Sequence, residues 1–126
     1  MSAQGSKFDQ DKVPMDLLDR YALEQTTAVL AFGAKKYGRD NWRGGMAHSR
    51  LIAAALRHTV AIADGEIVDP ESGLPHAAHA MCCVMFLLWM QKNRPDLNDV
   101  WQPRKIENDK KIPASTPPER TGKFSL

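Results

Sequence analysis

Two apolar segments joined by a short acidic turn, within residues 50–91, constrain the fold of this chain more than any other feature. The second segment, residues 77–90, is apolar on nearly every side of a helix, and such helices are buried in a protein or in a membrane. It is shorter than the ~20 residues that a membrane-spanning helix needs. We therefore predict an all-α bundle in which this segment is the central helix, without a membrane partner.

The hydrophobic period and the capping residues predict three helices and no strand. We expect these helices over residues 15–36, 50–64 and 75–92. Pro14 suits the first turn of the first helix, and Ser49 suits the N-cap of the second. Gly38 and Gly65 are expected to end those two helices, because glycine readily adopts the left-handed conformation found at helix ends.

Length, charge and cysteine usage bound the class of protein. The 126 residues fit one domain, divided into a flexible segment over 1–12, an all-α catalytic domain over 13–94 and an irregular Pro-rich tail over 95–126. The net charge of +2 lacks the strong basic excess typical of nucleic-acid-binding domains, so we expect no nucleic-acid partner. Cys82 and Cys83 are adjacent and poorly placed to pair, and the N-terminus has no apolar signal core, so we expect a cytoplasmic protein.

Four acidic residues and three histidines gather where the two apolar helices are expected to meet. They are His58, Asp64, Glu66, Asp69, Glu71, His76 and His79. Buried polar groups without partners are costly, so this density predicts a metal or phosphate-chemistry site. His76 and His79 are three residues apart and share one face of a helix. The alternative is that His58 is a core histidine bonded to a carbonyl, and that Asp69 or Ser72 only caps the following helix.

The same cluster contains ligand types for a divalent metal ion. Carboxylates are the ligands that Mg²⁺ prefers, usually alongside phosphates, whereas Zn²⁺ takes histidines more readily. Glu24, at the edge of the apolar face of the first helix, either reaches such a site or is a solvated border residue. The candidate metal ligands are Glu24, His58, Asp69, Glu71, His76 and His79.

The loop after the first helix combines cations, aromatic rings, an amide and glycines. Tyr37 and Trp42 can stack on a base, and Asn41 can read its edge. The cations can hold phosphates, since the planar donors of arginine match phosphate oxygens. The candidate substrate-binding residues are Lys35, Lys36, Tyr37, Asn41, Trp42, Arg43 and Arg57. The alternative is a structural loop whose aromatic rings pack into the body.

Four ordered motifs together resemble a known family. They are Gly33-Ala-Lys-Lys-Tyr-Gly38 followed by Asn41-Trp42, then Ala54-Ala-Leu-Arg-His58, then Asp69-Pro-Glu-Ser-Gly73, and His76-Ala-Ala-His-Ala80. The chain resembles the phage-type dATP/dGTP diphosphohydrolases, the MazZ branch of the MazG-like all-α nucleotide pyrophosphohydrolases, over residues 7–92.

The resemblance implies an activity, a cofactor and an assembly. A purine deoxynucleoside triphosphate, dGTP especially and dATP as a second substrate, would be hydrolysed to the monophosphate and pyrophosphate with Mg²⁺ or Mn²⁺. The bundle would be completed by oligomerisation, as a homodimer or homotetramer, in the host cytoplasm if the protein is phage-encoded. The candidate catalytic residues are Asp69, Glu71 and Glu66.

The chain departs from the wider MazG-like pattern in its acidic motifs. It contains no Glu-Glu-x-x-Glu, and Glu66-Ile-Val-Asp69 matches the second motif, Glu-x-x-Asp, only in letters, because Gly65 and Pro70 predict a turn there. Glu24 and the three histidines would then replace the missing acids. Two alternatives are a nucleotide-binding accessory protein without catalysis and another metal phosphohydrolase that releases tripolyphosphate. An HD-type enzyme of the second kind needs an adjacent His-Asp pair, which this chain lacks.

Overall fold

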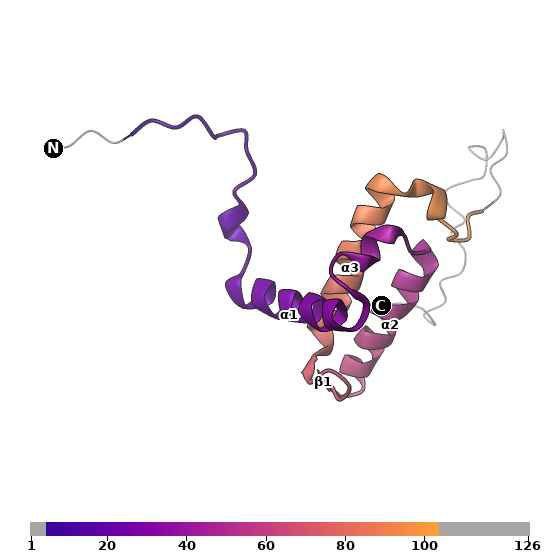
Figure 1. Cartoon of the computed structure of the whole chain (residues 1–126). Coiled ribbons are helices and arrows are strands. Elements are labelled where there is room, and N and C mark those ends of the chain that lie inside the picture. The colour runs from indigo at the N-terminus through magenta and orange to yellow at the C-terminus, as the bar shows by residue number, and fades with distance from the viewer. Residues whose placement is uncertain (1–4, 104–126) are drawn as a thin grey trace, which may run out of the picture.

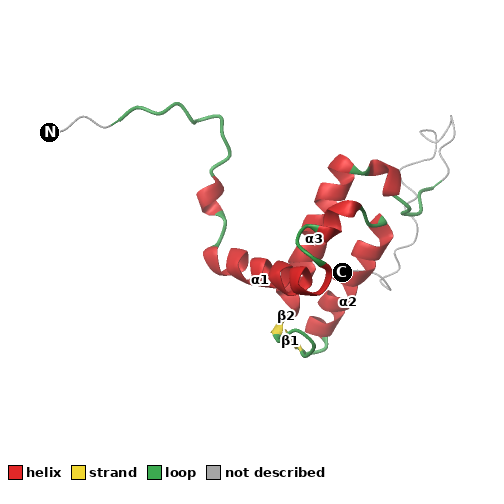
Figure 2. Ribbon diagram, viewed as in Figure 1, coloured by secondary structure: helices red, strands yellow, loops and turns green. Residues whose placement is uncertain are grey.

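Three helices form the body of the computed structural model, which describes residues 5–103 (Figure 1). They are α1 (Arg20–Tyr37), α2 (His48–Ala63) and α3 (His76–Asn93). A small hairpin of β1 (Val68–Asp69) and β2 (Leu74–Pro75) connects α2 to α3 (Figure 2). Three 3₁₀ turns complete the described chain: η1 (Met15–Leu17), η2 (Asn41–Gly44) and η3 (Pro95–Leu97). The predicted all-α class is confirmed.

The central position of α3 follows from its apolar sequence. It packs along α2 and also against α1, and Figure 1 shows it between them. Val29 of α1 meets Ala78 and Cys82 of α3 in the buried core, and Leu30, Leu74 and Phe86 pack around them. Met90, near the end of α3, is completely buried. No helix among residues 5–103 is long and apolar enough to cross a membrane.

The first helix begins later than predicted. Asp19 is its N-cap, and the Asp19 carboxylate accepts a hydrogen bond from the N–H of Ala22 at 2.8 Å. Aspartate is among the strongest N-cap residues, so the helix starts there, while the residues after Pro14 form only the separate turn η1. At the other end, Gly38 is the C-cap as predicted, with φ of 97°.

The second helix is capped from a distant part of the chain. Its N-cap is Ala47, and not Ser49 as predicted. The N–H and hydroxyl of Ser49 instead donate to the Asp99 carboxylate at 2.8 and 2.6 Å. These bonds lower the pKa of Asp99. An acid from beyond α3 thus satisfies a donor in the first turn of α2, which local sequence cannot show. Gly65, with φ of 97°, follows the end of α2 as expected.

The segment after α3 also contacts the loop before α2 and the start of that helix. The His48 ring bonds the Arg94 carbonyl at 3.0 Å, and Arg94 donates to the Gly44 carbonyl at 3.3 Å. Gly45 has φ of 111°, which favours glycine, and a Cβ there would lie 2.8 Å from the flexible Arg94 guanidinium and 2.9 Å from the end of the Leu97 side chain. The tail predicted over residues 95–126 therefore begins docked on the body, and residues 104–126 lie outside the described part.

The hairpin corrects the prediction that the chain has no strand. Its two strands pair antiparallel, with Val68 opposite Pro75 and Asp69 opposite Leu74. Strands of two residues are too short for an alternating pattern to show in the sequence. Gly73, with φ of 74°, donates its N–H to the Asp69 carbonyl at 2.7 Å and closes the turn. The hairpin thereby places Asp69 beside the start of α3.

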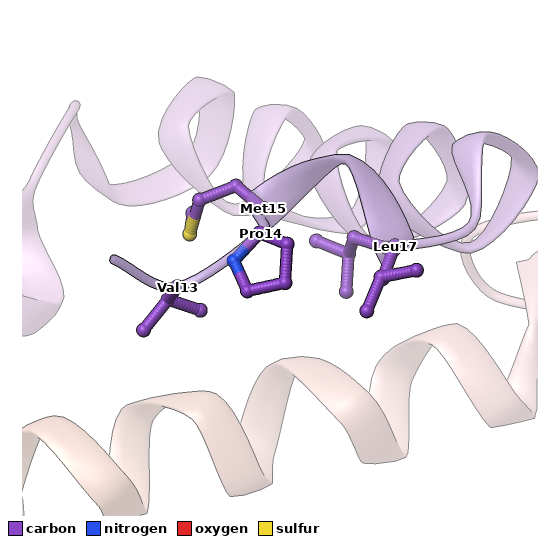
Figure 3. Close-up of a pocket in the computed structure, with 5 residues that line it drawn as sticks. Val13, Pro14, Met15 and Leu17 are labelled. Carbon is purple, nitrogen blue, oxygen red and sulfur yellow. The ribbon is translucent and has the colours of Figure 1, made fainter. Parts of the chain in front are cut away.

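The N-terminal arm, residues 5–19, extends away from the three helices (Figure 1). Its apolar side chains are largely exposed, Phe8 at 86% and Leu17 at 81%. A hollow of about 340 Å³ on this arm is lined by Val13, Pro14, Met15, Leu17 and Leu18. Figure 3 shows these side chains from close by. The hollow is formed by the arm alone, so it is separate from the helical body.

Candidate active site

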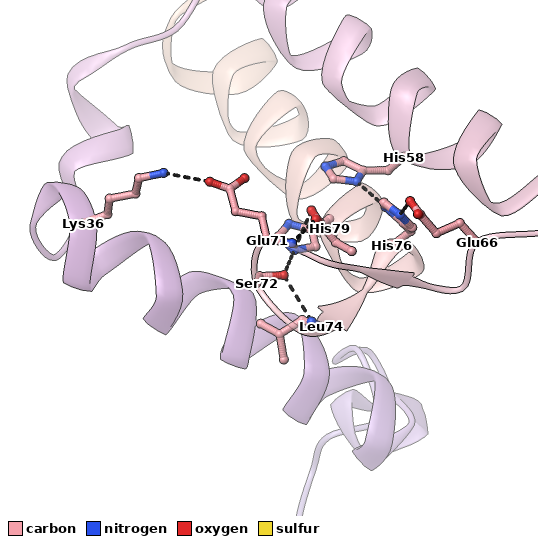
Figure 4. A network of polar contacts seen from close by, with 9 residues as sticks. Lys36, His58, Glu66, Glu71, Ser72, Leu74, His76 and His79 are labelled. Carbon is pink, nitrogen blue, oxygen red and sulfur yellow. Dashed lines mark hydrogen bonds and ion pairs between the residues drawn. The ribbon is translucent and has the colours of Figure 1, made fainter.

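Three histidines from two helices lie against one another where α2, the hairpin and α3 meet (Figure 4). The His58 ring of α2 stacks on the His79 ring of α3, with centroids 4.6 Å apart and an interplanar angle of 12°. The Nδ1 atoms of His58 and His76 are 2.9 Å apart, a hydrogen-bond distance. The structure therefore brings together the three histidines that the sequence pattern singled out.

His76 connects this cluster to Glu66. The His76 ring is buried at the start of α3, and its Nε2 lies 2.7 Å from a Glu66 carboxylate oxygen. An ionised carboxylate only accepts hydrogen bonds, so Nε2 of His76 carries the hydrogen. In a neutral His76 ring Nδ1 is then the acceptor, and His58 donates to it from its own Nδ1. The lone pair of His58 is consequently on Nε2, the nitrogen that His76 does not contact.

The hairpin supplies a carboxylate and a hydroxyl to His79. The Ser72 hydroxyl lies 2.7 Å from Nε2 of His79, and an Asp69 oxygen lies 3.6 Å from the same nitrogen. The turn fixes both groups, since Asp69 accepts from the N–H of Glu71 and Ser72 accepts from the N–H of Leu74. Asp69 thus forms a common side-chain-closed turn that holds its carboxylate beside the stacked rings.

Ligand atoms of His58, Asp69 and His79 all lie within 4.8 Å of one another. Two atoms bound at about 2.1 Å to a tetrahedral ion are roughly 3.4 Å apart, so a small movement would let them share one ion. Burial lowers the pKa of both His58 and His79, and for His58 the charges of His79 and His76 add to the effect. Neutral imidazoles offer lone pairs to a cation. These three residues therefore fit a divalent metal ion.

An open groove of about 1280 Å³ adjoins the histidine cluster. It is bounded by the C-terminal half of α1, the loop over residues 38–46 and α3, and His79 belongs to its wall. Five cationic side chains and one acidic side chain, Asp40, line it. The cations are Lys35, Lys36, Arg39, Arg43 and Arg50. A cationic groove larger than the ~300–1,000 Å³ typical of small-ligand sites can accommodate a nucleoside triphosphate.

Six of the seven predicted substrate-binding residues line this groove. They are Lys35, Lys36, Tyr37, Asn41, Trp42 and Arg43. Trp42 is packed into the body: its ring stacks on Phe86 at 4.4 Å and meets Trp89 edge-on at 5.1 Å, as the structural alternative for this loop stated. The Arg43 guanidinium lies 4.4 Å from the centre of the Trp42 ring and also bonds Asp40 at 3.0 Å. Tyr37, by contrast, is exposed at the end of α1.

Glu71 lies between the histidine cluster and the cations of the groove. Its carboxylate accepts from Lys36 at 3.3 Å, and this hydrogen bond raises the pKa of Lys36 (Figure 4). Both side chains are largely exposed. Glu71 is therefore outside the group formed by His58, Asp69 and His79, at the side of the site where α1 meets the hairpin.

Glu24 and Arg57 stand apart from the site that the other candidates share. Glu24 pairs with Arg20 at 3.1 Å on an exposed face of α1, as the solvated alternative stated. Arg57 is exposed on α2 and does not belong to the groove lining. After the larger effect of burial and of the neighbouring histidines, its charge also helps to lower the pKa of His58.

Three site residues were not singled out as ligands or substrate contacts from the sequence. Arg39 and Arg50 line the groove, and Ser72 holds His79. The sequence does not distinguish Arg50 from Arg57, which lies on the same helix but outside the groove. Nothing local marks Ser72, because its role depends on the hairpin. Cys82 and Cys83 also line the groove, and burial raises the pKa of Cys82 to about 12, so this thiol is not a ready nucleophile.

Comparison with known proteins adds a family relationship. Residues 2–100 match the family model described as dATP/dGTP diphosphohydrolase, N-terminal. Over 95 residues the chain is 44% identical to a protein of Salmonella phage PMBT28 named dATP/dGTP diphosphohydrolase, a match that covers 75% of this chain and 32% of that relative. The chain thus spans about a third of the length of the curated relative it matches. No solved structure matches it significantly.

Proposed function

The chain belongs to the family of dATP/dGTP diphosphohydrolase N-terminal domains, and from this premise we propose that it hydrolyses a purine deoxynucleoside triphosphate to the monophosphate and pyrophosphate. We expect dGTP to be favoured and dATP to be a second substrate, with Mg²⁺ or Mn²⁺ as cofactor, in the cytoplasm of a phage-infected host. The observation that carries the proposal is the group of His58, Asp69 and His79 beside a cationic groove of nucleotide size.

The groove provides the charge that a triphosphate requires. Lys35 and Lys36 come from the last turn of α1, and Arg43 comes from the loop that faces α3. Lysine and arginine donors form charge-assisted hydrogen bonds with phosphate oxygens, which are about twice as strong as neutral ones. Tyr37 is exposed at the same groove and offers a ring on which a purine can stack. In this arrangement the groove cations hold the phosphates next to His79.

The histidine cluster provides the place for a metal ion. A divalent ion held there would supply positive charge against the phosphates and would activate a water molecule. Asp69 and the two stacked imidazoles would hold it. Neighbouring side chains orient these ligands. Glu66 and His76 hold the proton on Nδ1 of His58, and Ser72 bonds the ring of His79.

A panel assay tests the activity. The full chain is incubated with each deoxynucleoside triphosphate and Mg²⁺ or Mn²⁺, and the products are separated by chromatography. We expect dGMP and pyrophosphate, with dGTP the best substrate. Release of tripolyphosphate, or of single phosphate, would contradict the proposed reaction.

A nucleotide-binding role without catalysis is the second candidate, favoured by the absence of the Glu-Glu-x-x-Glu motif from the sequence. The groove alone can bind a nucleotide, whatever the chemistry beside it. Calorimetric titration with dGTP distinguishes the two: saturable binding together with no turnover of any deoxynucleoside triphosphate would establish the second role and exclude the first.

We also propose that the chain assembles as a homodimer or homotetramer. Val84 and Leu88 of α3 are more than half exposed, although this helix is central to the fold. Leu56 and Val60 of α2 are exposed as well. Contiguous apolar surface on a folded protein usually marks an interface, and closed symmetric assemblies are the commonest way to cover it.

A further inference from the structure

The ligand types in the histidine cluster point to a particular class of metal ion. We propose that His58, Asp69 and His79 form a site for one transition-series divalent cation, such as Mn²⁺, Co²⁺ or Zn²⁺, that discriminates against Mg²⁺. This inference rests on the proposed function and narrows the cofactor expected there from Mg²⁺ or Mn²⁺ to Mn²⁺ and related transition-series ions. The three ligands come from three different elements, α2, β1 and α3, and their ligand atoms lie within 4.8 Å of one another.

Two imidazoles and one carboxylate are an unfavourable set for Mg²⁺. That ion is small, requires nearly octahedral oxygen coordination and usually keeps several waters. Imidazole nitrogen suits the later first-row ions, and the combination of two histidines with one carboxylate leaves coordination positions open for water or a phosphate oxygen. The only carboxylate in this group is Asp69, because Glu71 pairs with Lys36 and Glu66 pairs with His76.

Hydrogen bonds from neighbouring side chains fix the tautomer of the His58 ligand. Histidines that bind metals usually donate their other ring hydrogen to a fixed acceptor, which sets the tautomer. His58 has such an acceptor in Nδ1 of His76 at 2.9 Å, and Glu66 fixes the tautomer of His76 from the other side at 2.7 Å. The chain Glu66–His76–His58 therefore leaves Nε2 of His58 available as a ligand. Glu66 and His76 are positioning residues in this scheme.

The charge of the cluster agrees with a doubly charged ion. Asp69 and Glu66 contribute two negative charges close to the three rings. The hydrogen bond between His58 and His76 requires that one of the two Nδ1 atoms lacks a hydrogen, so the two rings cannot both be protonated. Direct binding of phosphate by a set of imidazolium rings is therefore less suited to this geometry than binding of a cation.

Metal binding without nucleotide tests the inference independently of turnover. The full chain, stripped with a chelator, is titrated with Mn²⁺, Co²⁺, Zn²⁺ or Mg²⁺ alone by calorimetry, and Co²⁺ is also followed by its visible absorption. We expect one ion per chain, with Zn²⁺ and Co²⁺ bound about 100-fold or more tightly than Mg²⁺ and Mn²⁺ in between. Asp69→Asn and His79→Gln should abolish the Co²⁺ bands, and Glu66→Gln should weaken binding roughly 10- to 100-fold while Glu66→Asp restores part of it.

Glu24→Gln is the matched control, since it also removes one carboxylate charge but lies outside the cluster, and it should keep the wild-type affinity. Circular dichroism checks that each variant is folded. If Mg²⁺ binds as tightly as Co²⁺, or the Asp69 and His79 variants keep the Co²⁺ bands, the inference is wrong, even if pyrophosphate is released. If the selective site is present and no triphosphate is hydrolysed, only the proposed function fails.

Discussion

The histidine cluster and the N-terminal arm differ in the burial of their side chains: the cluster encloses hydrogen-bonded polar groups, and the arm exposes apolar ones. In the cluster, polar groups from α2, the hairpin and α3 bond one another, and His76 is only 6% exposed. Among residues 5–103 no buried side-chain nitrogen or oxygen lacks a hydrogen-bond partner. In the arm, large apolar side chains such as Phe8 and Leu17 remain in solvent. The polar groups of the cluster are satisfied within one chain, whereas the arm leaves apolar surface exposed to solvent.

The difference has an energetic consequence. Burial of apolar surface contributes about 25 cal/mol per Å², so exposed arm residues contribute little to the stability of a single chain. The buried hydrogen bonds of the cluster contribute through the cost of leaving a partner unsatisfied, roughly 1–3 kcal/mol for each group. Four experiments separate the roles of the two regions.

The largest effect is expected for the carboxylate inside the cluster. Asp69→Asn should lower kcat/KM for dGTP by about 100-fold or more, because the charge that holds a metal ion is lost while the amide oxygen can keep the turn. Glu71→Gln removes a charge that pairs with Lys36 outside the group and should cost less than about 10-fold. Steady-state kinetics measures both. Equal losses would place Glu71 in the site, and wild-type rates for both would place the chemistry elsewhere.

Replacement of the buried His76 should lower the free energy of unfolding more than replacement of an exposed residue in the arm. His76→Ala removes a buried ring and leaves His58 unpaired, so we expect it to lower the free energy of unfolding by about 2–3 kcal/mol. Leu17→Ala in the exposed arm should change it by less than about 0.5 kcal/mol, measured at a concentration where the chain is monomeric. Urea denaturation gives both values. A large loss for Leu17→Ala would show that the arm packs on its own body.

The exposed apolar side chains of the arm should instead matter to the proposed assembly, because another copy of the chain can bury them as well as the exposed residues of α2 and α3. Light scattering at micromolar concentration should give a multiple of the 14.1 kDa chain mass. Leu17→Ser should raise the dissociation constant by about 10-fold, the equivalent of one apolar side chain no longer buried. Lys7→Ser, a polar change in the same arm, is the control. A monomer mass for the wild-type chain would exclude the proposed homodimer or homotetramer and, with it, the interface role of the arm.

The smallest effect concerns pH. Burial holds the pKa of His58 and His79 below the ordinary value of 6.5, so the unfolded chain binds protons more readily than the folded one as pH falls below that value. The free energy of unfolding should therefore be constant above about pH 7 and should decrease as pH falls through 6.5 toward the folded-state pKa values. Urea titrations at several pH values measure this slope. In a His58→Gln, His79→Gln variant the slope should be smaller, and an unchanged slope would assign it to other groups.

The sequence predicted those features that depend on neighbouring residues. The continuous apolar run of α3, the glycine at the end of α1 and the shared helix face of His76 and His79 are local features, and the structure agrees with each. The motif order also indicated the family. The seven predicted substrate residues were chosen from two stretches of chain, and six of them line one groove because they follow one another around the end of α1.

The remaining features depend on parts of the chain far apart in sequence. Ser49 has the right type for an N-cap, but the Asp99 carboxylate bonds it, and no local rule could show that. The sequence predicts that Trp42 stacks on a base, whereas in the structure Phe86, far along the chain, occupies a face of its ring. The hydrogen-bonded series from Glu66 through His76 to His58 depends on the hairpin, and its two-residue strands leave no periodic signal in the sequence.

The contacts that Asp99 and Arg94 make with the start of α2 give the downstream chain a mechanical connection to the groove. Asp99 bonds Ser49 across fifty residues of sequence, and the neighbouring Arg50 belongs to the groove lining. Arg94 and Leu97 lie against Gly45, which belongs to the loop that forms another part of the groove wall. Residues 94–99 therefore hold the first turn of α2 and this loop in place, and both are parts of the groove wall. A substitution at Asp99 or Arg94 would therefore disturb the groove although neither residue lines it.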